Sequence, residues 1–188
     1  MEFTDENFSC IEEMLAQDKI VAVGEIGLDY HWESDKQLQK VWFAAQIDLA
    51  RREGYPIMVH SRDAAADTLD MVKAEKAYEA GGVIHCFSYE KEMARQYLDL
   101  GFYLGIGGVL TFKNARKLKE IVEYMPLERI LLETDCPYLA PEPFRGKRND
   151  STLIRYVVDA IADIKGISKD EIVGVTTANS CRMYNIGQ

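Results

Sequence analysis

Short apolar runs recur along the chain, and longer amphipathic segments separate them. Five such runs consist mainly of aliphatic residues with little polar alternation, which is typical of parallel strands buried on both faces. They are Ile20–Gly24, Pro56–Val59, Gly82–Ile84, Phe102–Ile106 and Ile130–Leu132. We therefore expect five strands of a parallel sheet.

The segments between the runs predict helices because they carry start and stop signals. Ser34 and Gln37 form a candidate capping box, and Gly54 is placed to end the helix that follows. Ser168 and Glu171 form a second candidate capping box before the last helical segment. The helix that ends at Gly54 is expected to cover Gln39–Arg52. The other expected helices are Ala64–Lys76 after Asp63, Glu90–Leu100, Asn114–Tyr124, and Leu153–Ile164 between Ser151 and Gly166.

Strands and helices that alternate at this spacing predict βα units and a parallel sheet, and therefore an α/β fold. The pattern leaves two architectures open, a doubly wound open sheet and a (β/α) TIM-type barrel. The chain has 188 residues, and we expect one domain over residues 1–188. The polar residues at the strand ends favour the barrel.

Four of the five apolar runs are followed within three residues by a residue that can bind a metal ion. These residues are Glu25, His60, His85 and Asp135, whereas the fourth run leads into glycines that leave space. In a (β/α) barrel the carboxyl ends of the strands converge on the face that carries the active site. One histidine or carboxylate at a strand end is more often structural, but the in-phase arrival of four predicts a shared site.

Imidazole and carboxylate ligands suit Zn²⁺, Mn²⁺ and, in sets rich in carboxylates, Mg²⁺. A bound divalent ion lowers the pKa of its water toward about 7 and polarises a phosphoryl oxygen. The chain has no Ser or Cys in a nucleophile motif such as GxSxG. We therefore expect metal-assisted hydrolysis rather than attack by a side chain.

Charge and cysteine usage narrow the class of protein further. The net charge of −9 argues against a protein that coats nucleic acid through many Lys and Arg contacts. It is compatible with an enzyme that holds a few phosphates through metal ions and a basic loop. The four cysteines include no CxxC pair and indicate reduced thiols. Without a membrane-length apolar run or a signal-peptide pattern, we expect a cytoplasmic protein with no membrane attachment.

Five ordered blocks contain the candidate ligands or follow them. They are GEIGLDY at 24–30, HSRDA at 60–64, HCFS at 85–88, ETDCP at 133–137, and LAP at 139–141 followed by RGKRN at 145–149. Together these blocks resemble the TatD family of metal-dependent deoxyribonucleases, whose fold is an amidohydrolase-type TIM barrel. The likeness covers essentially the whole chain.

The resemblance implies a hydrolase of phosphodiester bonds in DNA, commonly a 3′→5′ exonuclease, with single-stranded DNA or 3′ ends as substrate. It implies two divalent ions, Mg²⁺, Mn²⁺ or Zn²⁺. In the family, the residue that matches Glu25 bridges both ions, and the residues that match His60 and His85 bind the second. The residue that matches Asp135 binds the first ion and handles the proton of the attacking water.

Three cations within these blocks are candidate substrate-binding residues. Arg62 could contact a phosphate or pair with an acid such as Asp63. Arg145 and Lys147 lie on a loop after the last predicted strand. Two roles are open for them: contact with a phosphate, or a solvated run of charges together with Arg148.

Other polar residues near the predicted strand ends are expected to be structural. Asp29 and Tyr30 are expected to shape the loop from strand to helix, and Glu133 to support its strand. His31 is expected at the surface or beside the substrate. A solvated helix face is expected for Lys113, Arg116, Lys117 and Lys119.

The chain departs from the family pattern because it contains neither the His-x-His pair of the family's first strand nor the GxHPH-like block. We expect about five of the eight βα units of a barrel. The chain would then be a fragment, the product of a misassigned start, or a natural short form. We expect at most one well-ligated metal site, formed by Glu25, His60 and His85, and little nuclease activity in this chain by itself.

Two other functions remain open on the sequence. One is another amidohydrolase-type enzyme that cuts amide or lactone bonds; several of these bridge their metals with a carboxylated lysine, whereas Glu25 occupies that strand end here. The other is a catalytically inactive remnant that acts as a binding module. An in-frame His-x-His segment upstream of Met1 would favour the enzyme.

Overall fold

Parallel strands are the framework of the computed structural model, which describes residues 5–187, with side chains from Phe8 onward. The strands follow the sequence order β1-β2-β3-β4-β5, which differs from a doubly wound sheet, where the order reverses at a switch point. The prediction of an α/β fold with five parallel strands is therefore confirmed. Their bounds are β1 Val23–Asp29, β2 Ile57–Arg62, β3 Gly82–Ile84, β4 Tyr103–Ile106 and β5 Ile130–Leu132.

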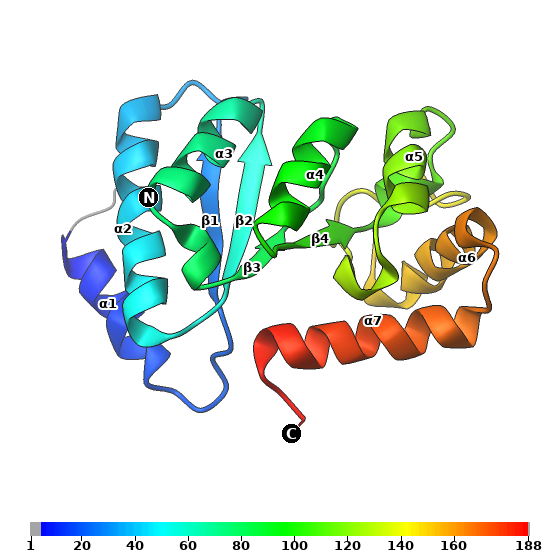
Figure 1. Ribbon diagram of the computed structural model, residues 1–188. Helices are drawn as coiled ribbons and strands as arrows, with labels where there is room; N and C mark the ends of the chain where they lie inside the picture. The colour runs from blue at the N-terminus through cyan, green and yellow to red at the C-terminus, as the bar shows by residue number, and fades with distance from the viewer. Residues whose placement is uncertain (1–4, 188) are drawn as a thin grey trace. The chain divides into compact units, whose positions relative to one another are not determined.

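The chain divides into two compact units, one with residues up to Gly82 and 184–186, the other with residues 83–183. Figure 1 labels the helices, which are α1 Asp5–Leu15, α2 Lys36–Glu53, α3 Ala65–Ala74, α4 Lys91–Asp99, α5 Arg116–Tyr124, α6 Ile154–Lys165 and α7 Lys169–Tyr184. Short 3-10 helices are η1 Ala77–Glu79, η2 Gly108–Thr111, η3 Leu127–Arg129 and η4 Ser151–Leu153. Between residues 5 and 187, no helix is both long and apolar enough to span a membrane.

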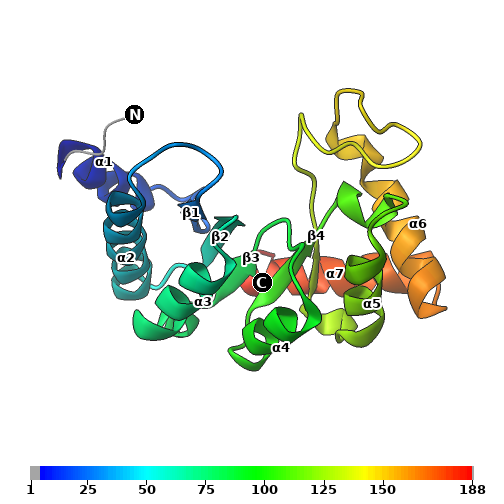
Figure 2. The ribbon, with the colours of Figure 1, turned by 90° about the horizontal axis from the view of Figure 1, so that it is seen from above.

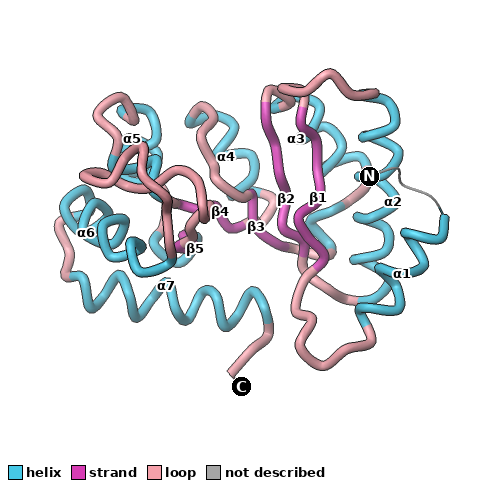
Figure 3. Tube along the Cα trace, turned by 180° about the vertical axis from the view of Figure 1, so that it is seen from behind, coloured by secondary structure: helices cyan, strands magenta, loops and turns pink. Residues whose placement is uncertain are grey.

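In the first unit, β1 and β2 pair in parallel, and α2 and α3 pack against one face of the pair (Figures 1 and 3). Leu28 of β1 and Ile57 and Val59 of β2 are fully buried, as is Phe43 of α2. These are apolar positions of the sequence pattern, so the helix and the strand pair share one core.

The start of α2 differs from the predicted capping box of Ser34 and Gln37. Asp35 is the N-cap, and its carboxylate accepts hydrogen bonds from the backbone N–H of Gln37 at 2.8 Å and of Leu38 at 3.1 Å. A carboxylate satisfies two free amides and suits the positive end of the helix dipole, which explains why Asp35 takes this position. Gly54 ends the helix in the left-handed conformation, as predicted.

The start of α3 also differs from the prediction, because Asp63 does not cap it. Ala64 occupies the N-cap position without a side-chain hydrogen bond, and the helix ends at Ala74 rather than at Lys76. The Asp63 carboxylate lies 3.5 Å from Nδ1 of His31 instead. The Asp63 side chain therefore contacts the loop that carries His31 rather than the first turn of α3.

In the second unit, β3 pairs with β4 and β4 with β5, and α5 lies between α4 and α6 (Figure 2). Asn179 holds α7 to this unit, because its buried amide donates to the carbonyl oxygens of Leu127 at 2.9 Å and Ile130 at 2.8 Å. The Ser168 hydroxyl accepts from the backbone N–H of Glu171 at 3.2 Å, one of the two bonds of the predicted capping box. Each of these contacts joins residues of the same unit.

The pairing of β1 with β2 makes Gly27 a sensitive position. Gly27 has a φ of 144°, and a Cβ placed there would lie 1.9 Å from the carbonyl oxygen of His60. We predict that Gly27→Ala lowers the free energy of unfolding by about 1–3 kcal/mol, because backbone strain and a steric clash act together. Urea unfolding followed by circular dichroism measures the change.

Gly174→Ala is the matched control, because nothing lies within 4 Å of a Cβ at this position of α7. We expect it to raise the free energy of unfolding by about 0.5–1 kcal/mol, the usual gain from replacing a helical glycine. Equal effects of the two substitutions would contradict the close packing of β1 on β2.

Candidate metal centre

A cluster of one histidine and two carboxylates forms where β1 lies beside β2. The register pairs Gly27 with His60, so Glu25 and Asp29 stand two residues to either side of the paired position on the same face. His60 Nδ1 lies 2.6 Å from Glu25 Oε1, and His60 Nε2 lies 3.2 Å from Asp29 Oδ2. Both ring nitrogens of His60 thus face a carboxylate.

The bounds of β1 explain why the sequence identified only part of this cluster. The predicted run ended at Gly24, but β1 extends to Asp29, so Glu25 is near the start of the strand and Asp29 is at its carboxyl end. The register shifts between Val23 and Ile26, and this irregularity falls on the residues that interrupt the apolar run. The two-residue spacing of Glu25, Gly27 and Asp29 on one strand was the signal that could have identified Asp29.

Asp29 has both a structural contact and a contact with a candidate ligand. Its Oδ1 accepts from the backbone N–H of His31 at 3.0 Å, and its backbone N–H donates to Gln39 Oε1 at 2.8 Å. These bonds shape the loop between β1 and α2, as expected. Its Oδ2 also contacts His60, which the sequence interpretation did not predict.

The electrostatics of this cluster favour the protonated form of His60. The hydrogen bond to Glu25 is the largest cause that raises the pKa of His60 above its usual value, and the charges of Glu25 and Asp29 add to it against the opposing effect of burial. A metal ion needs the neutral imidazole, so a proton on His60 competes with the metal.

A second cluster forms in the other unit around His85, just after β3. His85 Nδ1 lies 3.0 Å from Glu133 Oε2, and His85 Nε2 lies 3.5 Å from Asp135 Oδ1. The other oxygen of Glu133 accepts from the backbone N–H of Cys86 at 2.6 Å. The exposed fraction is 11% for the His85 side chain and 15% for Glu133, against 39% for Asp135.

Glu133 therefore contacts a candidate ligand, in addition to the structural role that was expected. The alternation of side chains along the strand predicted that Glu133 and Thr134 point to opposite faces. It did not show which of these two residues faces His85. Gly105 of β4 makes room for it, because a Cβ there would lie 2.1 Å from Glu133 Oε2. The expectation that the glycines at the end of the fourth run leave space is confirmed at Gly105, where the Glu133 side chain fills the space.

The donors of both clusters fit a borderline divalent ion, because each combines imidazole nitrogen with carboxylate oxygen. A histidine ligand usually donates its second N–H to a carboxylate, which fixes the ring. Glu133 is placed for this role at His85 Nδ1, so that His85 Nε2 and Asp135 could hold the metal. Among residues 5–187, no three His, Cys, Asp or Glu side chains already form a group arranged to hold an ion.

The structure brings Glu25 together with His60, and His85 together with Asp135, each pair within one unit. The meeting of all four at one pocket stays a prediction from the sequence. The residue types of both clusters are those of a metal site, as the strand-end pattern predicts.

The three candidate substrate-binding cations are exposed. Arg62 ends β2 and forms no ion pair within the described chain, while Asp63 contacts His31 instead, so the expected alternative of an Arg62–Asp63 pair is wrong. The guanidinium of Arg145 lies 4.3 Å from the Phe112 ring centre, and Lys147 Nζ lies 5.8 Å from that of Phe144. These contacts orient the two cations without neutralising them.

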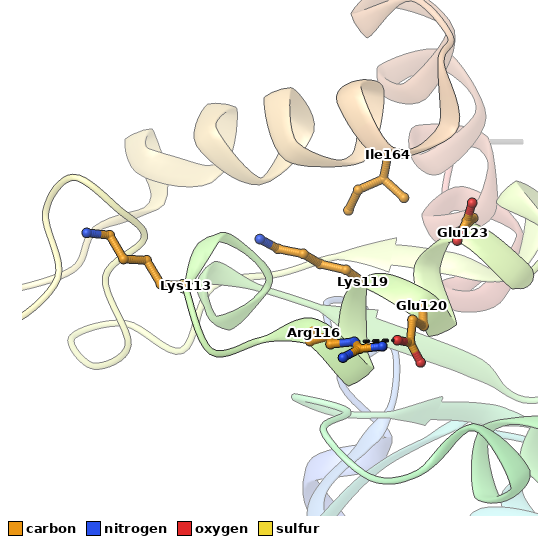
Figure 4. Close-up of a pocket in the computed structure, with 6 residues that line it drawn as sticks. All are labelled: Lys113, Arg116, Lys119, Glu120, Glu123 and Ile164. Atoms are coloured by element: carbon orange, nitrogen blue, oxygen red, sulfur yellow. Dashed lines mark hydrogen bonds and ion pairs between the residues drawn. The ribbon is translucent and has the colours of Figure 1, made fainter.

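A hollow of about 360 Å³ lies along α5 and contains none of the predicted site residues (Figure 4). Figure 4 shows Arg116 turned to Glu120, with which it forms an ion pair, and Lys117 pairs with Glu90. The expectation of a solvated helix face agrees with these pairs. The hollow is lined by Lys113, Arg116, Lys119, Glu120, Glu123 and Ile164.

Histidine and carboxylate side chains beside the strand ends of a parallel α/β fold are the kind of ligands that metal-dependent hydrolases use. The sequence model of the family described as TatD related DNase matches residues 1–185. The chain therefore belongs to the TatD-related DNase family, a family of metal-dependent hydrolases.

Named relatives agree with this membership. The chain is 46% identical over 187 residues to the uncharacterized metal-dependent hydrolase YabD of Bacillus subtilis, with 99% of this chain and 73% of the relative covered. It is 42% identical over 177 residues to the uncharacterized metal-dependent hydrolase YcfH of Escherichia coli K12, with 94% and 67% covered.

Solved structures agree on the fold. The crystal structure of the TatD homologue YJJV from Escherichia coli K12 superposes with a TM-score of 0.92 at 28% identity, over 98% of this chain and 72% of that one. A TatD-family hydrolase from Entamoeba histolytica gives a TM-score of 0.83 at 28% identity, over 96% and 67%. The barrel-type prediction therefore agrees with these neighbours.

The contacts of His60 predict its titration in the metal-free protein. We expect its pKa above the ordinary value of about 6.5, and we expect Glu25→Gln to lower it, because the main hydrogen-bond acceptor for the imidazolium is lost. Since folding raises this pKa, the contact stabilises the fold below pH about 6.5 and the contribution is lost as the pH rises through the folded-state value. The His60 Cε1–H resonance, followed by NMR against pH, measures the midpoint.

The exposed His31, whose Nδ1 lies 3.5 Å from the Asp63 carboxylate, gives a second histidine resonance for comparison. A His60 midpoint that does not move in Glu25→Gln would contradict the proposed cause.

The contact of Glu133 with His85 leads to a prediction about the affinity for a metal ion. We expect Glu133→Gln to weaken Mn²⁺ binding by about 10–100-fold, because His85 loses the carboxylate that fixes its ring. Isothermal titration calorimetry measures the affinity, and Glu142→Gln, at another half-buried acid of the same unit, is the control. Equal affinities of the Glu133 variant and the unsubstituted chain would remove Glu133 from the metal centre.

Proposed function

We propose that the metal centre of this protein hydrolyses phosphodiester bonds in DNA, with single-stranded DNA or 3′ ends as the substrate. The observation that carries the proposal is the pair of His–carboxylate clusters, which occur in a chain that the TatD-related DNase model matches over residues 1–185. DNA is inferred as the substrate from the family and from the chemistry of the exposed cations.

The residues that would hold two divalent ions are Glu25, His60, His85 and Asp135. When bound, such ions activate water and neutralise charge that develops on a phosphoryl group. Glu133 and Asp29 hold the histidine rings in orientation through their carboxylates. Asp135 is the most suitable proton acceptor, because it is the more exposed carboxylate beside His85.

Phosphate binding is assigned to Arg62, Arg145 and Lys147. All three are exposed, and none forms an ion pair in the part of the chain that the structure describes. Local cations are needed because the chain as a whole carries a net charge of −9, which repels a polyanion. The protein would then bind DNA through a few phosphate contacts and with a modest dependence on salt, because the salt effect grows with the number of phosphates neutralised.

The test of this proposal is cleavage of single-stranded DNA by the 188-residue chain, alone and extended by an N-terminal His-x-His segment, with Mg²⁺, Mn²⁺ or Zn²⁺. We expect cleavage to require the metal and to stop with a chelator. In the more active form, Asp135→Asn should lower kcat by about 100-fold or more with little change in KM, because it removes a group that handles a proton in the reaction.

Asp163→Asn, at an exposed acid of α6, is the matched control and should leave kcat unchanged. Cleavage that survives exhaustive chelation would exclude the metal mechanism. Metal binding without any cleavage of DNA in either form would favour another substrate or a binding module.

A further inference from the structure

Trp32 is an exposed indole in the loop between β1 and α2. Its exposed fraction is 66%, whereas Trp42, the other of the two tryptophans, is half-buried. Most of the Trp32 side chain is thus in contact with water, although burial of this large apolar surface would have stabilised the fold. The exposed indole is therefore available for contact with a ligand.

Hydrogen bonds hold the loop that presents Trp32. The Trp32 carbonyl accepts from the backbone N–H of Ser34 at 2.9 Å, and the side chain of Gln39 donates to the carbonyl of Asp29 at 2.9 Å and to the Ser34 hydroxyl. Asp35 then fixes the start of α2. The indole is thus held on an ordered loop, which lowers the entropy cost of binding a ligand.

The Trp32 loop is tied to the His60 cluster of the same unit. The ring centre of Trp32 lies 5.0 Å from that of His31 in a perpendicular arrangement. The backbone N–H of His31 donates to Asp29, whose other oxygen contacts His60. A ligand that covers the indole would therefore lie near the candidate metal ligands of β1 and β2.

A cation lies at the same end of the strand pair. Arg62 is the register partner of Asp29, and its carbonyl accepts from the backbone N–H of Tyr30 at 2.9 Å. An exposed aromatic ring and a guanidinium that forms no ion pair within the described chain thus belong to the same end of the strand pair. This combination matches a nucleotide, because a base has a π-face and its phosphate is an anion.

The surroundings argue against a protein partner at this surface. The neighbours of Trp32 along the loop are exposed polar residues, and an isolated aromatic among charges lacks the contiguous apolar area of a protein interface. The neighbours are His31, Glu33, Ser34, Asp35 and Lys36.

We propose that Trp32 stacks on a base of a single DNA strand whose phosphate is held by Arg62. The inference rests on the proposed function and makes it more specific. A base can stack on the indole only when it is out of the duplex stack, so the surface selects single strands and frayed ends over paired DNA.

The test uses the fluorescence of Trp32 in a Trp42→Phe background, where it is the remaining indole. The probe is a phosphorothioate octathymidylate, which resists cleavage, in the presence of Mg²⁺. We expect the probe to quench the Trp32 emission in a saturable way, with the same midpoint as the anisotropy of a fluorescein-labelled copy. A blunt duplex of equal length should quench it much less.

Substitutions separate stacking from simple apolar contact. We expect Trp32→Leu to weaken binding of the probe about 10-fold, because base–aromatic stacking is lost, and Trp32→Phe to retain most of the affinity. Tyr78→Ala, which removes another exposed aromatic side chain of the first unit, should leave the affinity unchanged.

The outcomes distinguish this inference from the function on which it rests. Probe binding by anisotropy with no quenching, or with equal affinities for Trp32→Leu and the unsubstituted indole, overturns the stacking role and leaves the nuclease proposal standing. No probe binding at any Mg²⁺ concentration overturns the proposed function, and the stacking role with it. Equal quenching by duplex and single strand overturns the selection for single strands.

Discussion

The His60 cluster of the first unit depends on the register in which β1 pairs with β2. Gly27 lies opposite His60, and its missing side chain lets the two backbones approach to a distance that any Cβ would block. Because side chains alternate along a strand, Glu25 and Asp29 then lie on either side of the His60 ring. A shift of one residue would turn both carboxylates to the opposite face.

The His85 cluster of the second unit also depends on a glycine. A glycine again provides space, but here Gly105 makes room for the Glu133 carboxylate rather than for a neighbouring backbone. Glu133 then joins His85 to the backbone N–H of Cys86. Such a buried acid is stable because each oxygen has a hydrogen-bond donor, and the arrangement leaves the other ring nitrogen of His85 facing Asp135.

The surface around these clusters has a division of chemistry that suits a polyanionic substrate. Acidic side chains lie next to the histidines, whereas exposed cations and an exposed indole lie at the ends of strands and in loops. A metal ion between the acids and a phosphate would reconcile the two, because it neutralises both. Under the proposed function, the net negative charge of the chain would limit contact with DNA to these positions.

The sequence by itself determined the number of strands and their parallel arrangement, because buried strands leave a local pattern. It proposed the four candidate ligands from the polar residues at the strand ends. The helix end at Gly54 was also predictable from the local sequence, because glycine readily adopts the left-handed conformation. Only the tertiary structure decided that Asp29 and Glu133 face the histidines and that Asp35 rather than Ser34 caps α2. Those outcomes depend on strand register and on competition between neighbouring donors and acceptors, which residues distant in sequence decide.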